Sequence, residues 1–474
     1  MLTDLSWLDV GKPFPPPCAI NRLLRYKENR ELFEDKHGEV YEEQFKRIER
    51  IIGNFRSVIS YAVIANYQKL ITLKTSDLAF GVEPSITVAD DAKQKVIDDI
   101  ISNTNLFDKL YTSALDISRY GDTILMLTSD GNVDVISPAL WFPVVDPYNI
   151  HKFKFHVFAF IYLADRKKES YGLKVQIHCP DEPSECEERN YLLSGKNSGE
   201  FKIVKDITKK EKMKIPTHID SCPVYRISNL LTSDRLFGID DYRTVDSLVS
   251  ELLVRISQIS KVLDKFAQPS MTGPQSAMQR DDVTGEWILK IGDYFPRNTQ
   301  DEPKPEYITW DADMEANFKQ IELIINQLYT VSEMGSALLG DLSNKTGDVP
   351  SGSALRRLMM SPLAKARRIV NRYNQPVKKI LSALAKLQGE DISPTEITIK
   401  WNDGLPSDPV EDAEIANIRT GGKATLSQYT AIKRLDKMSD KDAETELEMI
   451  RGDTLENSAG TVPPFEEETV LEVE

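Results

Sequence analysis

A short stretch that ends in two arginines, GDVPSGSALRR at residues 347–357, has the residue types of a phosphate-binding loop. In such a loop (G-x4-G-K-[ST]) backbone N–H groups cradle phosphates, a lysine reaches the β- and γ-phosphates, and a hydroxyl binds Mg²⁺. Here a serine and an alanine follow Gly352, so the lysine is missing, and the preceding LLGDLSNKT does not read as a buried strand. We therefore interpret residues 341–352 as a flexible loop, followed by a helix that Ser351 or Ser353 caps.

Cysteine and histidine occur near each other in two places, which raises the question of a zinc site. HCPDEPSEC holds His178, Cys179 and Cys186, and HIDSC holds His218 and Cys222. The spacings, C-x6-C and H-x3-C, differ from those of common structural zinc sites. Four cysteines in 474 residues do not suggest a disulfide framework, which favours a reducing cytoplasm. We expect ordinary cysteines and no metal site, with zinc as the alternative.

Other patterns typical of catalysis are absent from the sequence. There is no HExxH, GxSxG or DxDxDG pattern, and the chain has five histidines. A Ser-His-Asp or Cys-His site can assemble in space from distant residues, but no pattern points to one. We expect a protein that is not an enzyme, with no catalytic residues and no cofactor.

The overall charge limits which contacts with nucleic acid are expected. The formal net charge is −15 and the pI is near 5.1, whereas proteins that grip DNA phosphates are usually basic. We therefore expect only local contact with nucleic acid. No apolar run approaches the ~18 residues that span a bilayer. The start, MLTDLSWLDVGKPFPPP, lacks the features of a secretory signal, so we expect no membrane partner.

Hydrophobic periodicity divides the chain into an α+β part and a series of long helices. Strand-like patterns fill residues 122–228 and include a hairpin with Asp130 and Gly131 at its turn. Two long helical patterns flank a short island with strand-like character, so these helices should lie antiparallel with the island at their shared tip; Asp240 is the expected N-cap of the first. The predicted units are 1–30 (an irregular N-terminal arm), 31–236 (α+β), 237–268 (helix), 269–311 (island), 312–340 (helix), 341–352 (loop), 353–389 (long kinked helix), 390–452 (mainly helical) and 453–474 (disordered acidic tail).

The predicted helix at residues 353–389 is unusually basic. Residues 351–389 contain nine Lys or Arg and no Asp or Glu, and Pro362 and Pro376 should kink the helix. Two interpretations stay open: the basic stripe contacts nucleic acid or an acidic neighbouring subunit, or it pairs with the chain's own carboxylates. The stripe comprises Arg357, Lys365, Arg368, Arg372 and Lys379.

Four stretches, in the family's own order, resemble segments of the portal proteins of tailed double-stranded DNA bacteriophages, of the long-tailed siphophage type. They are NYQKLITLKTSDLAFGVEPSITV, ALDISRYGDTILMLTSDGNVDVISPALWFPVVD, SGSALRRLMMSPLAKARRIVNRYNQPVKKIL and IKWNDGLPSDPVEDAEIANIRTGGKATLSQYTAIKRL. Together they cover residues 60–450. Residues 165–215 carry no signal of this family.

The resemblance implies a portal fold and a dodecameric ring with a central channel for DNA. Residues 31–236 are then the wing, the two long helices form the stem, residues 269–311 are the clip and residues 390–452 the crown. The loop at 341–352 looks like the tunnel loop of the family, and the basic helix after it returns to the wing. The implied DNA-proximal residues are Asn344, Lys345, Thr346, Gly347, Asp348 and Val349, and the implied partner contacts in the clip are Met271, Gln275, Trp287 and Tyr294.

The resemblance also implies a place in the virion, at the portal vertex of the capsid, after assembly in the host bacterial cytoplasm. The implied partners are double-stranded DNA, the major capsid protein and scaffold, the terminase large subunit and the head–tail adaptor protein. Two other classes stay open at this point. One is a nucleotide-using nucleic-acid enzyme with a degenerate loop, and the other is a different connector or baseplate protein of the virion.

Overall fold

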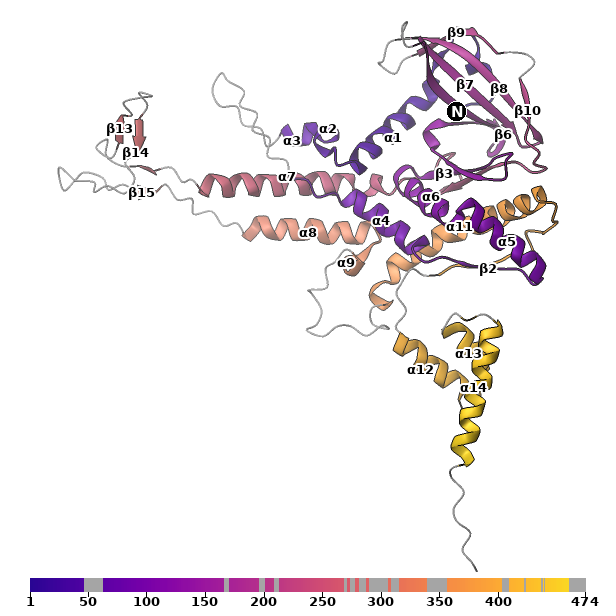
Figure 1. The fold of residues 1–474 in the computed structure, drawn as a ribbon. Helices are drawn as coiled ribbons and strands as arrows, with labels where there is room; N and C mark the ends of the chain where they lie inside the picture. The colour runs from indigo at the N-terminus through magenta and orange to yellow at the C-terminus, as the bar shows by residue number, and fades with distance from the viewer. Residues whose placement is uncertain are drawn as a thin grey trace, which may run out of the picture. The chain divides into compact units, whose positions relative to one another are not determined.

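In a computed structural model the chain forms two compact units (Figure 1). Unit 1 comprises Met1–Lys345 and Leu358–Gly404, and unit 2 comprises Thr346–Arg357 and Leu405–Glu474. The structure describes residues 1–46, 63–165, 170–195, 201–208, 213–267, 271–272, 278–280, 287–289, 306–307, 315–338, 356–402, 409–421, 423–435, 438 and 440–459. Within these ranges all strands belong to unit 1 and unit 2 is helical, which agrees with the predicted α+β class.

The helices of the first 120 residues begin and end at residues suited to those positions. They are α1 (Ile20–Phe33), α2 (His37–Val40), α3 (Glu42–Phe45), α4 (Tyr67–Phe80), α5 (Asp91–Thr104) and α6 (Leu106–Tyr120). At the start of α4 the Asn66 side chain accepts the N–H of Lys69, and at the start of α5 Asp90 accepts two backbone N–H groups. α6 ends at Gly121, whose φ of +82° favours glycine.

A long helix, α11 (Met360–Leu387), lies at the centre of the largest hydrophobic core of unit 1. Its apolar residues recur every three or four positions, and Ile369, Tyr373 and Val377 are at most 1 % exposed. Tyr373 also hydrogen-bonds Ser113 of α6, with 2.8 Å between the hydroxyl oxygens. The apolar face that the sequence predicted therefore packs inward.

The beginning of α11 differs from the prediction. The sequence predicted one helix from residue 353, whereas α11 starts at Met360, after a turn at Met359. Pro362 consequently lies in the first turn of the helix. Backbone N–H groups in the first turn have no intrahelical acceptor, so a proline there removes no hydrogen bond. Pro376 does lie inside the helix.

A three-stranded antiparallel sheet, in the order β11–β3–β4, follows α6. Its strands are β3 (Asp122–Leu127), β4 (Val133–Ile136) and β11 (Val224–Ser228). The predicted hairpin is confirmed: Leu127 pairs with Val133, and Gly131 in the turn has a φ of +81°. Two further strands, β2 (Ser85–Thr87) and β16 (Thr398–Lys400), pair antiparallel and return the chain after α11 to the region between α4 and α5.

A larger antiparallel sheet has the order β1–β9–β8–β7–β6–β5, with β10 paired to β8. Its strands are β1 (Pro13–Phe14), β5 (Trp141–Asp146), β6 (Asn149–Asp165), β7 (Ser170–Cys179), β8 (Glu182–Ser194), β9 (Phe201–Asp206) and β10 (Lys214–Pro216). The N-terminal segment contacts both ends of this order, because Leu2 pairs with Val144 of β5 and β1 pairs with β9.

The N-terminal segment is not the irregular arm that was predicted over residues 1–30. Trp7, Leu8 and Phe14 are buried in one hydrophobic core with the larger sheet, and Leu8 is 1 % exposed. α1 then begins at Ile20, and the Arg22 guanidinium donates to two backbone carbonyls at the start of β5. The difference arises because the apolar residues among the prolines pack into a core whose other members lie far away in the sequence.

Two long helices, α7 (Tyr242–Ala267) and α8 (Glu315–Val331), lie side by side (Figure 1). Between them the chain forms two short strand pairs, β12 (Met271–Thr272) with β15 (Glu306–Tyr307) and β13 (Met278–Arg280) with β14 (Trp287–Leu289). The second helix was predicted over residues 312–340 but ends at Val331. Glu333 and Gly335 have φ values of +61° and +67°, which break the helix before a short α9 (Gly335–Leu338).

The described residues of unit 2 after Gly404 form the helices α12 (Pro409–Thr420), α13 (Gln428–Leu435) and α14 (Asp440–Ala459). The sequence predicted a disordered tail from residue 453, but α14 continues to Ala459. Residues 460–474 lie outside the described ranges. No helix in the described part of the chain is both long and apolar enough to cross a membrane.

Two histidines are buried in the larger sheet and lack charge. His156 of β6 pairs with His178 of β7, whose Nε2 lies 3.6 Å from Cys186 Sγ of β8. Burial is the main cause that lowers the pKa of His156 to about 3 and the pKa of His178 to about 4. An unfolded histidine has a pKa near 6.5. The stability that these residues contribute is therefore present above about pH 6.5 and is lost as the pH falls toward 4.

The free energy of unfolding should accordingly decrease between about pH 7.5 and about pH 5, as measured by urea denaturation. His178→Gln should reduce this decrease by on the order of 2 kcal/mol, because one buried group no longer titrates. Gln176→Asn on the same strand is the control and should keep the full pH dependence. Equal pH dependence in the two variants would show that His178 does not cause it.

Candidate functional site at the base of the long helix pair

A buried ion pair joins α11 to both long helices. Lys365 of α11 lies with its Nζ 3.1 Å from Oδ1 of Asp241, directly before α7, and donates to the carbonyl of Ser332, directly after α8, at 3.3 Å. The side chains of Lys365 and Asp241 are 5 % and 9 % exposed. One ammonium group therefore connects the start of one long helix with the end of the other.

Further hydrogen bonds stabilise the Asp241 carboxylate. The Ser118 hydroxyl donates to Oδ2 at 2.8 Å, and the Asn229 amide donates to Oδ1 at 2.9 Å. The N–H of Asp241 donates to the carbonyl of Ser118 at 2.9 Å. A buried charge is strongly destabilising unless a counter-ion and hydrogen bonds accompany it. The position before the first turn of α7 also lets the helix dipole favour the negative charge.

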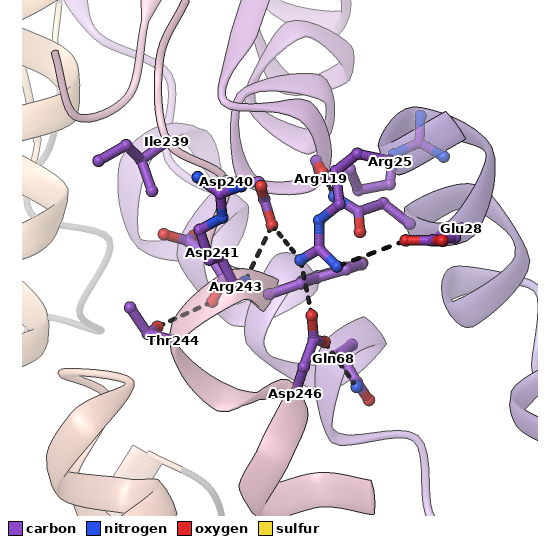
Figure 2. A network of polar contacts seen from close by, with 12 residues as sticks. Arg25, Glu28, Gln68, Arg119, Ile239, Asp240, Asp241, Arg243, Thr244 and Asp246 are labelled. Atoms are coloured by element: carbon purple, nitrogen blue, oxygen red, sulfur yellow. Dashed lines mark hydrogen bonds and ion pairs between the residues drawn. The ribbon is translucent and has the colours of Figure 1, made fainter. Parts of the chain in front are cut away.

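A second ion-pair cluster ties α1 to the same end of α7 (Figure 2). One Nη atom of Arg25 lies 2.8 Å from Oδ1 of Asp240 and 2.6 Å from Oδ2 of Asp246. Burial disfavours the charge on Arg25, but the hydrogen bonds and charges of the two aspartates outweigh burial and raise its pKa. Asp240 Oδ1 also accepts the N–H of Arg243, which fits the capping role that the sequence predicted for Asp240.

Neutral side chains surround the Asp246 carboxylate on its other side. The Tyr41 hydroxyl and the Gln68 amide both donate to Oδ1, at 3.2 and 3.4 Å, and Gln68 also donates to Tyr41 at 2.8 Å. Gln68 Oε1 lies 3.1 Å from Nε2 of His37. Burial is the main cause that lowers the pKa of His37, so this ring stays uncharged at neutral pH. α2, α4 and α7 are linked through these groups.

A third buried carboxylate fixes the chain that leads into α7. Asp122, at the start of β3, is fully buried, and its oxygens accept the Ser228 hydroxyl at 2.6 Å and the N–H of Gly238 at 2.8 Å. Arg226 Nε lies 3.2 Å away. A Cβ atom on Gly238 would lie 2.0 Å from the carbonyl oxygen of Gly121, so only glycine fits this crossing.

The carboxylates of the cluster are bound to cations and hydrogen-bond donors of the chain itself. Their effect is mechanical: they hold the base of the α7–α8 pair to α1, α6 and α11. We call this set the stem-base cluster; it consists of Arg25, Asp122, Asp240, Asp241, Asp246 and Lys365.

The structure separates the basic stripe into residues that pair within the chain and residues that do not. Lys365 is buried in the stem-base cluster, so it is not available to DNA or to a neighbouring subunit. Arg368 lies 2.5 Å from Glu333, an internal pair that agrees with the alternative interpretation. Arg372 and Lys379 have no carboxylate partner among the described residues, and burial together with the charges of nearby arginines lowers the pKa of Arg372. Arg357 is exposed.

The remaining predicted residues lie mostly outside the described ranges. This holds for the six loop residues Asn344 to Val349 and for Gln275 and Tyr294. Met271 begins β12 and Trp287 begins β14, with no description of their side chains. Their contacts with DNA or partner proteins stay predictions. Within the described residues, no three His, Cys, Asp or Glu side chains are grouped as metal ligands.

The sequence contained a partial signal for the stem-base cluster. The run Gly238-Ile-Asp-Asp before a periodic helix indicated a cap, and Asp240 was predicted from it. Four residues were missed because their partners come from elements far away in the sequence: Arg25, Asp122, Asp241 and Asp246. A Gly-Asp pair directly after a helix, as at Gly121, is the one local feature that could have drawn attention to Asp122.

Comparison with known families gives one match that covers most of the chain. The family described as "Phage portal protein, SPP1 Gp6-like" matches residues 21–455. No curated protein matches the sequence.

Several solved structures resemble the chain at low identity. A chain in the neck of an empty gene transfer agent (GTA) particle, computed with C6 symmetry, is 13% identical with a TM-score of 0.46; the match covers 82% of this chain and 95% of that chain. A chain in the virion of a native gene transfer agent particle is 12% identical with a TM-score of 0.44, over the same shares of both chains. TM-scores below 0.5 establish neither a shared fold nor a shared function.

Lys365→Met should destabilise the protein by about 3 kcal/mol, because it leaves the Asp241 carboxylate buried without a counter-ion. Urea denaturation measures the change. Lys379→Met, on the exposed side of the same helix, should change the free energy of unfolding by less than about 0.5 kcal/mol. The double variant Lys365→Met/Asp241→Asn should recover part of the loss, since both charges are then absent. Equal stability of the Lys365→Met and Lys379→Met variants would refute the role of the ion pair.

Proposed function

Because this chain belongs to the SPP1 Gp6-like phage portal protein family, we propose that it forms a dodecameric ring at one vertex of the capsid. Double-stranded DNA passes through the channel of this ring during packaging and ejection. A phage portal protein is a structural component of the virion, located at the neck of the capsid, and not an enzyme. The alternative of a nucleotide-using enzyme is therefore not pursued.

The observation that carries the proposal is the stem-base cluster. In the proposed ring α7 and α8 form the stem, and the short strands between them form the clip. A helix of 26 residues is about 40 Å long, so a force on the clip acts at a distance of about 40 Å from the stem base. Buried ion pairs resist such a load, because movement that separates a pair leaves a buried charge without its counter-ion. The cluster thus supports a stem that keeps its angle to the wing.

The other parts of the chain follow the same assignment. The α+β part from residue 31 to residue 236 forms the wing, which meets the major capsid protein and scaffold. The clip, residues 269–311, receives the terminase large subunit during packaging and the head–tail adaptor protein afterwards. Residues 390–452, with the helices of unit 2, form the crown.

The channel lets DNA slide because the chain is acidic overall. Duplex DNA carries one charge per about 1.7 Å, and a strongly basic channel would hold it in place. A net charge of −15 favours passage, with local contact at the loop between the stem and α11. This tunnel loop spans residues 341–352 and brings Asn344 to Val349 close to the DNA.

Closing a ring requires two different surfaces on each subunit. The outward cations of α11 contribute one of them. Arg372 and Lys379 lack carboxylate partners among the described residues, so an acidic surface of the next subunit can pair with them. Arg357 follows the tunnel loop in the sequence and is exposed, which supports a contact with DNA or the next subunit.

Native mass measurement with negative-stain imaging tests the ring. Twelve copies of 53.7 kDa give about 644 kDa, and the particles should be rings with an open centre. If the purified protein is a monomer, the measurement is repeated with scaffold protein, which raises the local concentration. A compact dimer without a central opening under both conditions would contradict the proposal.

Deleting residues 343–349 should leave ring assembly intact and reduce the amount of DNA that capsids retain, because the DNA-proximal loop is shortened. The measurement is the DNA content of particles assembled with the variant, with ring assembly checked by native mass. A matched deletion in the turn at residues 129–131, distant in sequence from the loop, is the control. Capsids filled to the normal level by the loop deletion would count against the assignment of the tunnel loop.

A further inference from the structure

A small pocket of about 270 Å³ opens between α11 and the end of β16 in unit 1. Its floor is apolar: Leu78, Leu363, Ala366 and Val370 are each less than 9 % exposed, and Val370 belongs to the largest hydrophobic core. Its rim is formed by Arg367 of α11 and by Lys400, Trp401 and Asn402. The stem-base cluster does not include any of these residues.

The two cations at the rim of this pocket have no carboxylate partner among the described residues. Both side chains, Arg367 and Lys400, are exposed. The indole Nε1 of Trp401 is buried and has no hydrogen-bond partner in the same part of the chain. Buried donors without an acceptor are rare in folded proteins. None of the residues that line the pocket is acidic. The pocket is therefore complementary to an oxyanion.

The rim is held in place before any ligand arrives. Asn402 donates to the carbonyl of Glu83 at 2.6 Å, which fixes the chain after β16. The Trp401 ring packs edge-on against Phe80, with 5.7 Å between ring centroids. Phe80 in turn contacts Tyr373 of α11, at 4.7 Å. A donor set that is already positioned binds its ligand with a smaller loss of conformational freedom.

A carboxylate fits this pocket better than a phosphate of DNA. A phosphodiester is flanked by two sugars, and recognition of DNA requires several cations along the backbone. This pocket holds two cations and has room for one side chain, whose methylene groups can lie on the apolar floor. The chain itself offers many such side chains, with 74 acidic residues against 59 basic ones.

We infer that this pocket binds a carboxylate side chain of a second copy of the chain, with Arg367 and Lys400 as donors. The inference rests on the proposed ring, and it names one contact of the interface that closes it. A concave donor pocket on one subunit and a protruding acidic side chain on the next are different surfaces, as a ring requires.

The test compares the concentration at which half of the chains associate, measured by analytical ultracentrifugation. Arg367→Ala/Lys400→Ala should raise this concentration at least about tenfold, the factor that corresponds to 1.4 kcal/mol. Lys95→Ala/Lys205→Ala removes the same charge outside the pocket and outside α11, and should leave it unchanged. Trp401→Phe keeps the aromatic contact with Phe80 and should also leave it unchanged, because the indole N–H is buried and does not face the ligand.

Each other outcome overturns the inference in a recognisable way. If Arg367→Ala/Lys400→Ala associates like the control, the carboxylate contact is wrong while the ring stands. If that variant associates normally but binds a short DNA duplex more weakly than the control in fluorescence anisotropy, the ligand is a DNA phosphate. If the wild-type chain does not associate at any concentration, or with scaffold, the ring and the contact fail together.

Discussion

Burying a carboxylate requires a cation and hydrogen-bond donors beside it, and this requirement determines how unit 1 is held together. Asp240, Asp241 and Asp246 gather at the start of α7, where the helix dipole also favours negative charge. Their cations, Arg25 and Lys365, come from α1 and α11. α1 and α11 thus supply cations to α7, while α8 packs against α7 through apolar residues and the carbonyl directly after α8 accepts a hydrogen bond from Lys365. Polar groups at the base and apolar contacts along the helices together hold the long helix pair.

The sequence predicted what depends on neighbouring residues. The hairpin at Gly131, the course of α7 and the apolar face of α11 follow from turn chemistry and from helical periodicity. The resemblance to portal proteins, read from four stretches, agrees with the family match over residues 21–455. The interruption after α8 was missed, because a non-glycine residue such as Glu333 rarely adopts a positive φ and nothing in its type indicates it.

The candidate site was less predictable, because its residues are partners only in three dimensions. Lys365 was correctly placed among the cations of α11, but the sequence does not tell which side of the helix the end of α8 covers. The sequence therefore left open whether Lys365 makes an external contact or an internal pair, and its pair with Asp241 agrees with the internal alternative. The same helix carries outward cations, such as Lys379, that fit the original interpretation. The basic stripe therefore contains both a buried lysine that pairs within the chain and exposed cations, and burial distinguishes the two kinds.

The N-terminal segment has a consequence for the order of events during synthesis. Its strand β1 pairs with β9, and Leu2 pairs with β5, so its partners follow about 140 and about 190 residues later. At roughly 5–20 residues per second, the ribosome needs roughly 10–40 s to make the chain up to β9. Trp7, Leu8 and Phe14 stay without their core for that time. A chaperone that shields these three side chains acts in this interval, which ends before Tyr373 of α11, a partner of Phe80, has been made.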